Sequence, residues 1–427
     1  MLRYLLPLFI LLPATLFAQA ENRLTSGIVA YNSGDYEDAL HNLNEALANE
    51  ALLPGEKQAK AWYYKGMTLQ ALLREATFNN DAQKLEKYQN AVLDSYEAFV
   101  KAIGIPEAGD EIRMKTLGYF SELQPLLLQT GFLFMNQQHA QAAFPYLNAA
   151  FSIGQNGWGG KHYLAANLRG QAYLMLGDSA AALNDFQEAI NWYAEFTPPV
   201  PDFLAGYIYY RKAVLERFFL RNPEQALATV EAAFPFLDQE WQRSDVWRES
   251  LTADHAAQNR TNYEQVRRDL QSLKLDLLLN IPAMYNRALA EFDQAVAADP
   301  SNFRLLLSYA SLLESTDTEK AVTMYRRALD ADPSQVTAWF NLGALYVNQA
   351  SGISVQMQTE ADDARYKILS DQMLAYLQEA LPLLTRAHQL QPNDIAILQA
   401  LKQITISLEL PDLYQEYKQK LDALEGQ

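Results

Sequence analysis

The sequence predicts an all-α fold in which helical hairpins stack side by side as a solenoid. The chain of 427 residues contains only 18 glycines. This is about 4%, against an average usage of roughly 7%, and it disfavours folds rich in tight turns. Hydrophobic residues make up 49% of the chain, which is enough to build a packed core. The third observation is a pattern of small and aromatic residues that recurs at an almost constant interval.

The first twenty residues have the pattern of an export signal. Arg3 precedes an apolar run from Tyr4 to Phe17, which is shorter than the roughly 20 residues that a membrane-spanning helix needs. A run of about 7–15 apolar residues followed by small residues is typical of a secretory signal peptide, and Ala18-Gln19-Ala20 follows here. We therefore expect residues 1–20 to be cleaved and the mature chain to have no membrane span. An uncleaved membrane anchor is the alternative.

The recurring pattern is clearest between residues 269 and 335. The marker residues of one copy are Tyr285, Ala288, Phe292, Ala295 and Pro300. The markers of the next copy, 33 positions after their counterparts, are Ala321, Tyr325, Ala328 and Pro333. Alanine at these places lets two helices approach to about 8–10 Å, and proline ends the second helix because it cannot continue it. Each copy therefore predicts one helical hairpin.

This order of residues resembles the tetratricopeptide repeat (TPR), a helical hairpin of about 34 residues. The first-helix half of the repeat appears as Trp339, Leu342, Gly343 and Tyr346. The clearest copy in the first half of the chain is Gly170, Ala172, Tyr173, Gly177, Asp178, Ala182, Phe186 and Ala189. The resemblance implies a right-handed superhelical solenoid. A polar-faced pair of capping helices is expected at its C-terminal end, because the last repeat has no neighbour to cover it.

The spacing between copies divides the chain into two blocks of repeats. We expect an N-terminal block of about five units over residues 21–240 and a C-terminal block over residues 269–427. Residues 241–268 between them lack a sustained apolar face and are expected to form a polar linker or insertion. A further insertion is expected at 348–372, either as a longer helix pair or as a projecting loop, and the capping helices are expected within 395–424.

The composition disfavours several classes of partner and site. The formal net charge is −17, and Lys and Arg occur in runs of no more than two, whereas a nucleic acid binder needs a basic face that displaces counterions. The same charge disfavours binding to an anionic membrane surface. The absence of cysteine excludes disulfides and thiolate metal sites. We therefore expect protein or peptide partners and no nucleic acid, and the sequence leaves the oligomeric state open.

The sequence offers no catalytic or metal-binding motif. Its five histidines are isolated from one another, whereas helical zinc sites pair them one turn apart. The Gly-rich stretch Gly154–His162 fails the phosphate-loop pattern, because Gln155 replaces its first glycine and His162 replaces the Ser or Thr that holds magnesium. We interpret this stretch as a flexible loop between repeats. We predict no catalytic residue, no metal ligand and no cofactor.

In TPR proteins the first helices of the hairpins line a concave groove, and the resemblance assigns groove residues in this chain. They are Tyr31, Tyr63, Met67, Phe132, Asn167, Gln171, Arg211 and Phe340, and Gln70 occupies a further groove position. Aromatic and methionine side chains suit a peptide with apolar anchors, since aromatic residues dominate interface hot spots. The family's carboxylate clamp for acidic C-terminal peptides needs Lys and Asn at matched places. Leu24 and Ile28 stand there in the first unit, so that mode of binding is not expected.

Together these observations predict a non-enzymatic scaffold or adaptor of the bacterial cell envelope that binds a peptide or protein segment in the concave groove. The expected compartment is the periplasm, with peripheral attachment to the outer membrane as a variant. Two alternatives stay open. The chain is an envelope enzyme, or it is a small-molecule carrier, with a site in the superhelix interior or in the insertions.

Overall fold

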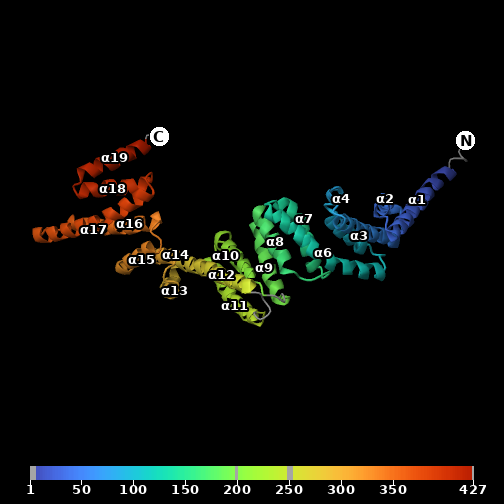
Figure 1. The fold of residues 1–427 in the computed structure, drawn as a ribbon, viewed down its shortest axis with the longest axis horizontal. Coiled ribbons are helices and arrows are strands. Elements are labelled where there is room, and N and C mark those ends of the chain that lie inside the picture. The colour runs from blue at the N-terminus through green and yellow to red at the C-terminus, as the bar shows by residue number, and fades with distance from the viewer. Residues whose placement is uncertain (1–5, 198–200, 248–252, 426–427) are drawn as a thin grey trace. The chain divides into compact units, whose positions relative to one another are not determined.

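The computed structural model describes residues 6–197, 201–247 and 253–425. Side chains are described within 16–197, 201–244 and 254–424. Over these ranges the chain consists of helices and short 3₁₀ turns and contains no strand. The chain divides into two compact units, Met1–Leu270 and Gln271–Gln427, and Figure 1 shows each unit as a series of helices in chain order.

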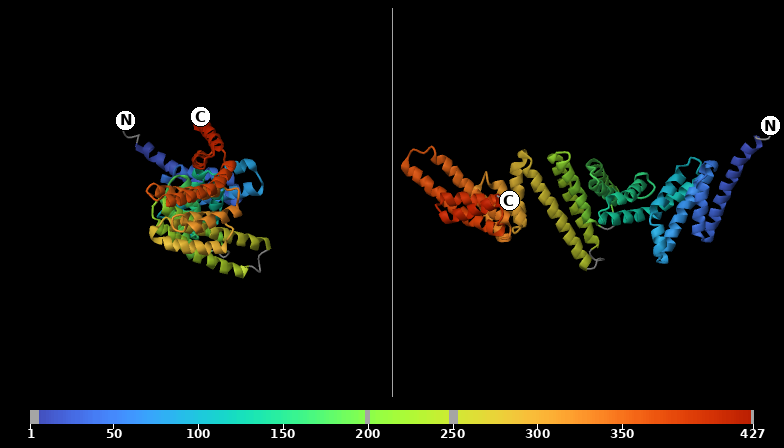
Figure 2. Two further views of the ribbon diagram at one scale, coloured as in Figure 1. Left: turned by 90° about the vertical axis from the view of Figure 1, so that its left-hand side faces the viewer. Right: turned by 90° about the horizontal axis from the view of Figure 1, so that it is seen from above.

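The first unit is built from successive helical hairpins. α1 packs on α2, α3 on α5, α6 on α7, α8 on α9 and α10 on α11, and each hairpin also contacts the next one along the chain (Figure 2). The helices are α1 (Leu6–Ser33), α2 (Tyr36–Leu47), α3 (Gly55–Phe78), α4 (Ala82–Lys87), α5 (Ala91–Gly104), α6 (Asp110–Asn136), α7 (Ala140–Gln155), α8 (Tyr163–Met175), α9 (Ser179–Glu195), α10 (Gly206–Phe218) and α11 (Pro223–Trp247). A helix with one buried stripe is stable only against a neighbour, and stacking supplies that neighbour on both sides.

The second unit continues the same construction. α12 (Ala253–Leu279) runs across the boundary between the units. The following helices are α13 (Tyr285–Ala298), α14 (Phe303–Leu313), α15 (Thr318–Ala331), α16 (Val336–Met357), α17 (Asp363–Leu390), α18 (Ile395–Ser407) and α19 (Pro411–Glu425). α14 packs on α15, α16 on α17 and α18 on α19, and neighbouring hairpins are in contact. The prediction of an all-α solenoid of helical hairpins is therefore confirmed.

A left-handed residue ends the first helix of several hairpins. Gly34, Asn80, Gln138, Gly177, Arg221 and Glu409 all have φ between 52° and 85°. After α8, Gly177 N donates to Leu174 O at 3.1 Å and Asp178 N donates to Tyr173 O at 2.9 Å. These bonds satisfy two of the carbonyls that a helix end leaves unpaired. Asp178 Oδ1 then accepts from Ala181 N at 2.9 Å and caps the start of α9.

Small residues mark the closest approach of paired helices. A Cβ added to Gly131 of α6 would lie 2.5 Å from Leu147 Cδ2 of α7. A Cβ added to Gly170 of α8 would lie 2.9 Å from a ring carbon of Phe186 in α9. Interiors packed this tightly leave no room for the extra carbon without moving a neighbour. Gly170 is a marker of the clearest copy of the repeat in the first half of the chain, so the pattern in the sequence corresponds there to a helix contact.

The stretch expected as a polar linker or insertion, 241–268, is described in two parts, 241–247 at the end of α11 and 253–268 at the beginning of α12, and residues 248–252 lie outside the described residues. Three aromatic side chains pack it onto the first unit. The ring centroids of Trp241 and Tyr263 are 4.5 Å apart, and Phe203 lies 6.0 Å from Trp241 and 5.7 Å from Tyr263. The boundary between the compact units falls just after this stretch, between Leu270 and Gln271.

The other expected segments also lie in helices. Within the range 348–372, residues 348–357 end α16 and residues 363–372 begin α17, so this hairpin is a longer helix pair, and α18 and α19 cover the range expected for the capping helices. The predicted leader, residues 1–20, falls mostly outside the residues with described side chains, although α1 includes Leu6 to Ala20. Among the described residues, no helix is both long and apolar enough to cross a membrane.

The Gly-rich loop Gly154–His162 is fixed to the interior of the first unit. Trp158 stacks on Phe120 of α6 with 4.9 Å between ring centroids. The buried Gln124 of α6 donates from Nε2 to Ala150 O at 3.0 Å and to Gly160 O at 2.8 Å. One carbonyl of α7 and one of the loop thus receive a partner from the preceding first helix, so this loop is held more firmly than the glycine content alone suggests.

Candidate functional site

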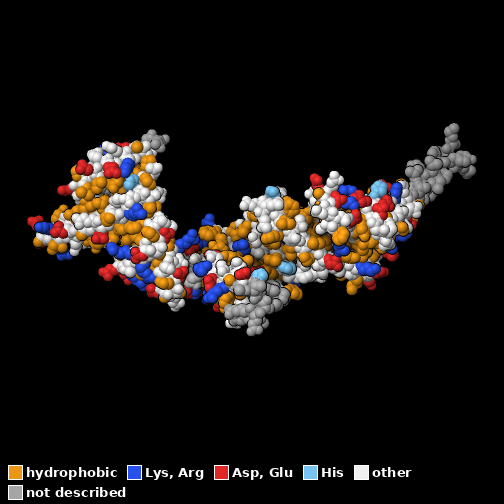
Figure 3. Space-filling view, viewed as in Figure 1, with side chains coloured by type: hydrophobic (Ala, Val, Ile, Leu, Met, Phe, Trp, Pro, Cys, Tyr) orange, Lys and Arg blue, Asp and Glu red, His pale blue; other side chains and the backbone are white. Residues whose placement is uncertain are grey.

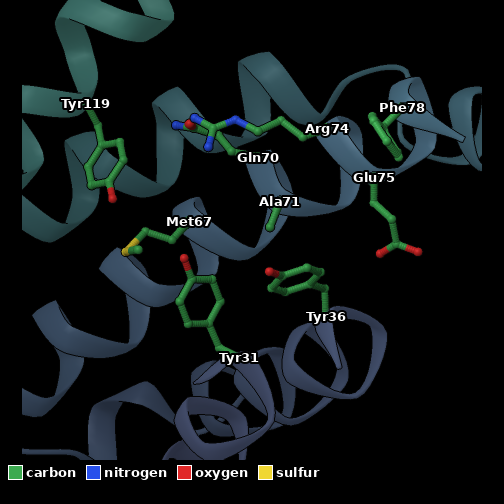
Figure 4. Close-up of a pocket in the computed structure, with 9 residues that line it drawn as sticks. All are labelled: Tyr31, Tyr36, Met67, Gln70, Ala71, Arg74, Glu75, Phe78 and Tyr119. Atoms are coloured by element: carbon green, nitrogen blue, oxygen red, sulfur yellow. The ribbon is translucent and has the colours of Figure 1, made fainter. Parts of the chain in front are cut away.

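A pocket of about 330 Å³ lies between the first helices of the first three hairpins. Figure 4 shows its side chains arriving from α1, α2, α3 and α6. The lining residues are Tyr31, Tyr36, Met67, Gln70, Ala71, Arg74, Glu75, Phe78 and Tyr119, and we call this the Tyr31 pocket. Two predicted groove residues, Tyr31 and Met67, meet in it, together with Gln70 from a further groove position.

Tyrosine rings form much of the wall of the Tyr31 pocket. The Tyr31 ring centroid lies 5.6 Å from that of Tyr36 and 5.5 Å from that of Tyr64. Tyr119 approaches from α6, with its ring centroid 6.1 Å from that of Tyr63. Burial raises the pKa of Tyr31, so its hydroxyl stays protonated and keeps both a donor and an acceptor function. The wall is therefore apolar over its ring faces and polar only at the hydroxyls.

Gln70 is the unusual polar group of the pocket. Its side chain is only 8% exposed, and its Nε2 has no hydrogen-bond partner among the described residues. Figure 4 shows the Gln70 and Arg74 side chains extending from α3 in the direction of Tyr119. A buried amide donor without a partner destabilises a fold, so this donor is available for an acceptor that the chain itself does not supply.

The charged residues of the pocket are already paired near its rim. Arg74 Nη2 donates to Glu122 Oε2 at 3.2 Å, and both side chains are largely exposed. Glu75 Oε1 accepts from Lys84 Nζ at 2.8 Å. Phe78 is 91% exposed beside them. On the face drawn in Figure 3, acidic and basic side chains are interspersed over the described residues and are not gathered by sign.

Five predicted groove residues of the first unit lie outside the lining of the Tyr31 pocket, namely Tyr63, Phe132, Asn167, Gln171 and Arg211. Tyr63 is buried in the main core of the unit behind the pocket wall, and burial raises its pKa. Phe132 is exposed on α6. Arg211 of α10 lies beside Tyr207, with Cζ 5.9 Å from the ring centroid, and burial lowers the pKa of its guanidinium.

The remaining predicted residues are distributed over two further places. Asn167 and Gln171 of α8 form a pair in which Gln171 Nε2 donates to Asn167 Oδ1 at 3.3 Å, and Asn167 is buried. Phe340 is half-buried against the core of the second unit. The structure therefore brings together only part of the predicted set, and the assignment of the others to a groove stays a prediction.

Tyr36, Arg74 and Tyr119 line the pocket but were not predicted as site residues. Tyr36 opens α2, whereas the prediction drew on first helices alone. Tyr119 belongs to α6, which begins at Asp110, well before the part of this helix that the repeat pattern marks. A sequence signal for Tyr36 is its place two residues after Gly34, directly beyond the turn that ends α1.

A second cavity of the first unit, of about 430 Å³, surrounds Trp62. Lys101 Nζ lies 4.1 Å and Lys65 Nζ 5.1 Å from its ring centroid, and Trp62 Nε1 donates to Glu50 Oε2 at 2.9 Å. The Trp62 ring, the two lysines and Glu50 therefore already contact one another. Over the described part of the chain, no group of three His, Asp or Glu side chains is placed to hold a metal ion.

Comparison with known protein families identifies two segments of the chain. The family described as "Tetratricopeptide repeat" matches residues 24–76, which include most of the Tyr31 pocket. The family described as "TPR repeat" matches residues 311–349 in the second unit. Among curated proteins, none is significantly similar to the chain.

Several solved structures are similar to this chain at low sequence identity. The assembly chaperone of RpL4 (Acl4) is 16% identical, with 68% of this chain and 98% of that chain covered and a TM-score of 0.44. YrrB, "a TPR protein with an unusual peptide-binding site", is 16% identical, with 57% and 96% covered and a TM-score of 0.34. A TPR repeats protein from Bacteroides fragilis NCTC 9343 is 16% identical, with 66% and 98% covered and a TM-score of 0.28.

The two family matches lie in different compact units. The first match covers the end of α1, all of α2 and most of α3, and the second covers the last residues of α14, all of α15 and the larger part of α16. Each compact unit thus contains one segment that is similar to the tetratricopeptide repeat family.

Proposed function

We propose that this chain is a non-enzymatic adaptor that binds a segment of a partner protein along the first helices of its first unit. The observation that carries this proposal is the Tyr31 pocket, in which Tyr31, Met67 and Tyr119 come from the first helices of three successive hairpins. TPR proteins bind protein partners along such helices, and here the family's groove positions meet at a cavity.

The size and lining of the pocket suit a short peptide stretch. Its volume of about 330 Å³ is at the lower end of the roughly 300–1,000 Å³ that is usual for ligand sites. Tyrosine rings and the Met67 thioether offer large contact areas that lose little conformational entropy on binding. A few side chains of an extended segment would fill the pocket, while the rest of the segment follows the neighbouring helices.

The proposed place of action is the bacterial cell envelope. Its support is the leader pattern of Arg3, the apolar run from Tyr4 to Phe17 and the small residues Ala18-Gln19-Ala20. Cleavage after Ala18 or Ala20 leaves Glu21, whose carboxylate pairs with Lys57 of α3, near the start of the shortened α1. Intact-mass measurement of the protein from an envelope fraction tests this proposal, and a mass that begins at Met1 would exclude cleavage.

Site-specific photocrosslinking in native envelopes tests the adaptor proposal. A photoreactive phenylalanine analogue at Tyr31 is expected to capture one or a few defined partners. The same analogue at Tyr366, an exposed tyrosine of α17 outside the pocket, serves as the control. If both positions give the same adducts, or if Tyr31 gives none, the pocket is not the binding site.

A further inference from the structure

We infer that the Tyr31 pocket recognises a proline-rich segment, with Gln70 Nε2 donating a hydrogen bond to a backbone carbonyl of that segment. This inference rests on the proposed function and specifies the chemistry of the partner. It is carried by the unpartnered amide of Gln70, which is 8% exposed and lines the pocket.

Gln70 buries an amide group at a place where an apolar side chain would fit. A methionine side chain would occupy nearly the same volume as Gln70 without a buried polar group. A donor that finds no acceptor is destabilising, and its burial is compensated only when a partner arrives. The chain offers no such partner for Nε2 among the described residues, so the ligand has to bring the acceptor.

The lining of the Tyr31 pocket carries several hydrogen-bond donors. Besides Gln70, the lining contributes the guanidinium of Arg74, which has N–H groups left beside the one that Glu122 accepts, and the hydroxyls of Tyr31, Tyr36 and Tyr119, which can donate or accept. Its one carboxylate, Glu75, already accepts from Lys84. A complementary ligand therefore accepts hydrogen bonds and brings few N–H groups of its own. Proline meets this condition, because it has a carbonyl and no N–H.

Two tyrosine rings set at an angle shape the wall of the pocket. The Tyr31 and Tyr36 rings are inclined at 54° to each other with 5.6 Å between centroids, so they present two apolar faces at an angle. Polyproline II segments dock on aromatic faces of this kind with little loss of entropy, since they are already extended when free. Proline rings would cover the tyrosine faces while a carbonyl reaches Gln70.

Charge decides between a neutral and an acidic acceptor. A carboxylate would also accept from Gln70 and Arg74. However, the chain has a net charge of −17, which repels acidic peptides at long range, and Arg74 is already paired with Glu122. The neutral carbonyl of a proline-rich segment satisfies the same donors without this repulsion.

Fluorescence anisotropy with the full chain tests the inference. The probe is a fluorescein-labelled oligoproline that ends in a carboxamide, and the comparison probe is an oligoglutamate of the same length. Wild type is expected to bind the oligoproline more tightly. Gln70→Met is expected to bind it about tenfold more weakly, the loss of one hydrogen bond, while its melting temperature is equal to or above that of wild type.

Two further variants make the test specific. Gln349→Met is the matched control, because Gln349 of α16 also carries a buried amide atom without a partner, its Oε1, but lies in the second unit. It is expected to bind the probe like wild type. Tyr36→Leu removes one aromatic face and is expected to weaken oligoproline binding as well.

Three results would overturn the inference. They are no binding of the oligoproline, tighter binding of the oligoglutamate, and equal affinity of Gln70→Met and wild type. The adaptor proposal is judged separately by crosslinking at Tyr31. If defined adducts form there while the oligoproline does not bind, the pocket has a partner of another chemistry and only the present inference fails.

Discussion

Arg169 of α8 and Asp185 of α9 form a bidentate ion pair, with Arg169 Nε 2.7 Å from Asp185 Oδ2 and Nη2 2.7 Å from Oδ1. The side chains are only 12% and 5% exposed. Arg169 also donates from Nη1 to Asn148 Oδ1 at 2.8 Å, and its Cζ lies 3.4 Å from the ring centroid of Phe151. One guanidinium thus connects α7, α8 and α9, and it compensates a carboxyl whose pKa is raised by burial.

Replacing Arg169 by Ala is expected to destabilise the first unit strongly. The variant leaves Asp185 buried without its cation, and breaking a buried pair in this way costs about 3–5 kcal/mol. Removing Lys115, whose pair with Glu111 is exposed on α6, is expected to change the free energy of unfolding far less, because water screens an exposed pair. Urea unfolding of Arg169→Ala and Lys115→Ala measures the two values.

The double variant Arg169→Met/Asp185→Leu is the control for this interpretation. Removing both partners is expected to recover most of the lost stability, because no buried charge is then left unpaired. If the double variant is as unstable as Arg169→Ala, the loss comes from packing against Phe151 and the ion pair is not its cause.

Two glycines of one helix are expected to respond in opposite directions to the same substitution. Gly131→Ala places a Cβ 2.5 Å from Leu147 Cδ2, and such overpacking typically costs about 1–3 kcal/mol. Gly118→Ala, also in α6, meets nothing within 4 Å, and it is expected to stabilise by about 0.5–1 kcal/mol because alanine restricts the unfolded chain. Thermal unfolding of both variants tests the pair. Equal shifts would mean that the distances at Gly131 do not describe the helix contact.

The contact glycines also explain why the fold could be predicted from the sequence. Small residues recur at positions such as Gly131 and Gly170 because two helices can approach closely only where the side chains between them are small. The turns were harder to predict, since Asn80, Gln138 and Arg221 hold positive φ where glycine is usual. Residues 241–268 look polar in sequence, but Trp241 and Tyr263 pack on each other and on Phe203. This packing is hard to predict from the sequence, because it depends on an aromatic residue that is distant in the chain.

The candidate site could be predicted only in part. The repeat pattern places Tyr31 and Met67 on first helices, and both line the pocket. Tyr119 joins them because α6 extends far beyond the marked repeat, and an insertion of that kind follows no periodic rule. The lack of a partner for Gln70 Nε2 depends on the positions of all surrounding atoms, which no sequence pattern encodes.

His388 is expected to make the stability of the second unit depend on pH. It is 7% exposed, its Nε2 lies 3.1 Å from Lys420 Nζ, and its ring packs edge-on against Tyr417. Burial, and secondarily Lys420, lower the pKa of His388. The unfolded chain therefore takes up a proton near the ordinary value of about 6.5 while the folded chain does not, so stability is present above that pH and is lost as the pH falls below it.

Hydrogen exchange of α17 and α19 at about pH 7.5 and about pH 5.5, on either side of the ordinary histidine pKa, measures this effect. His388→Phe keeps the ring against Tyr417 and removes the titration, so its protection is expected to change less between the two conditions. His139→Phe, at an exposed histidine of the first unit, is expected to leave the pH dependence of α17 and α19 as it is in wild type. If His388→Phe retains the full pH dependence, another group is responsible.

Tyr31 and Tyr63 are expected to separate binding from stability, although both are predicted groove residues. Tyr63 is buried in the core against Phe99, with 6.1 Å between ring centroids, so Tyr63→Ala is expected to cost about 3–5 kcal/mol and to weaken partner capture only through loss of structure. Tyr31 is half-buried at the pocket wall, so Tyr31→Ala is expected to lose the partner with a much smaller change in unfolding free energy. Unfolding curves measured beside recovery of the partner by pulldown from native envelopes distinguish the two effects. Tyr63→Phe keeps the ring and is expected to match wild type in both measurements, and a loss of binding by this variant at unchanged stability would place the Tyr63 hydroxyl in the binding site.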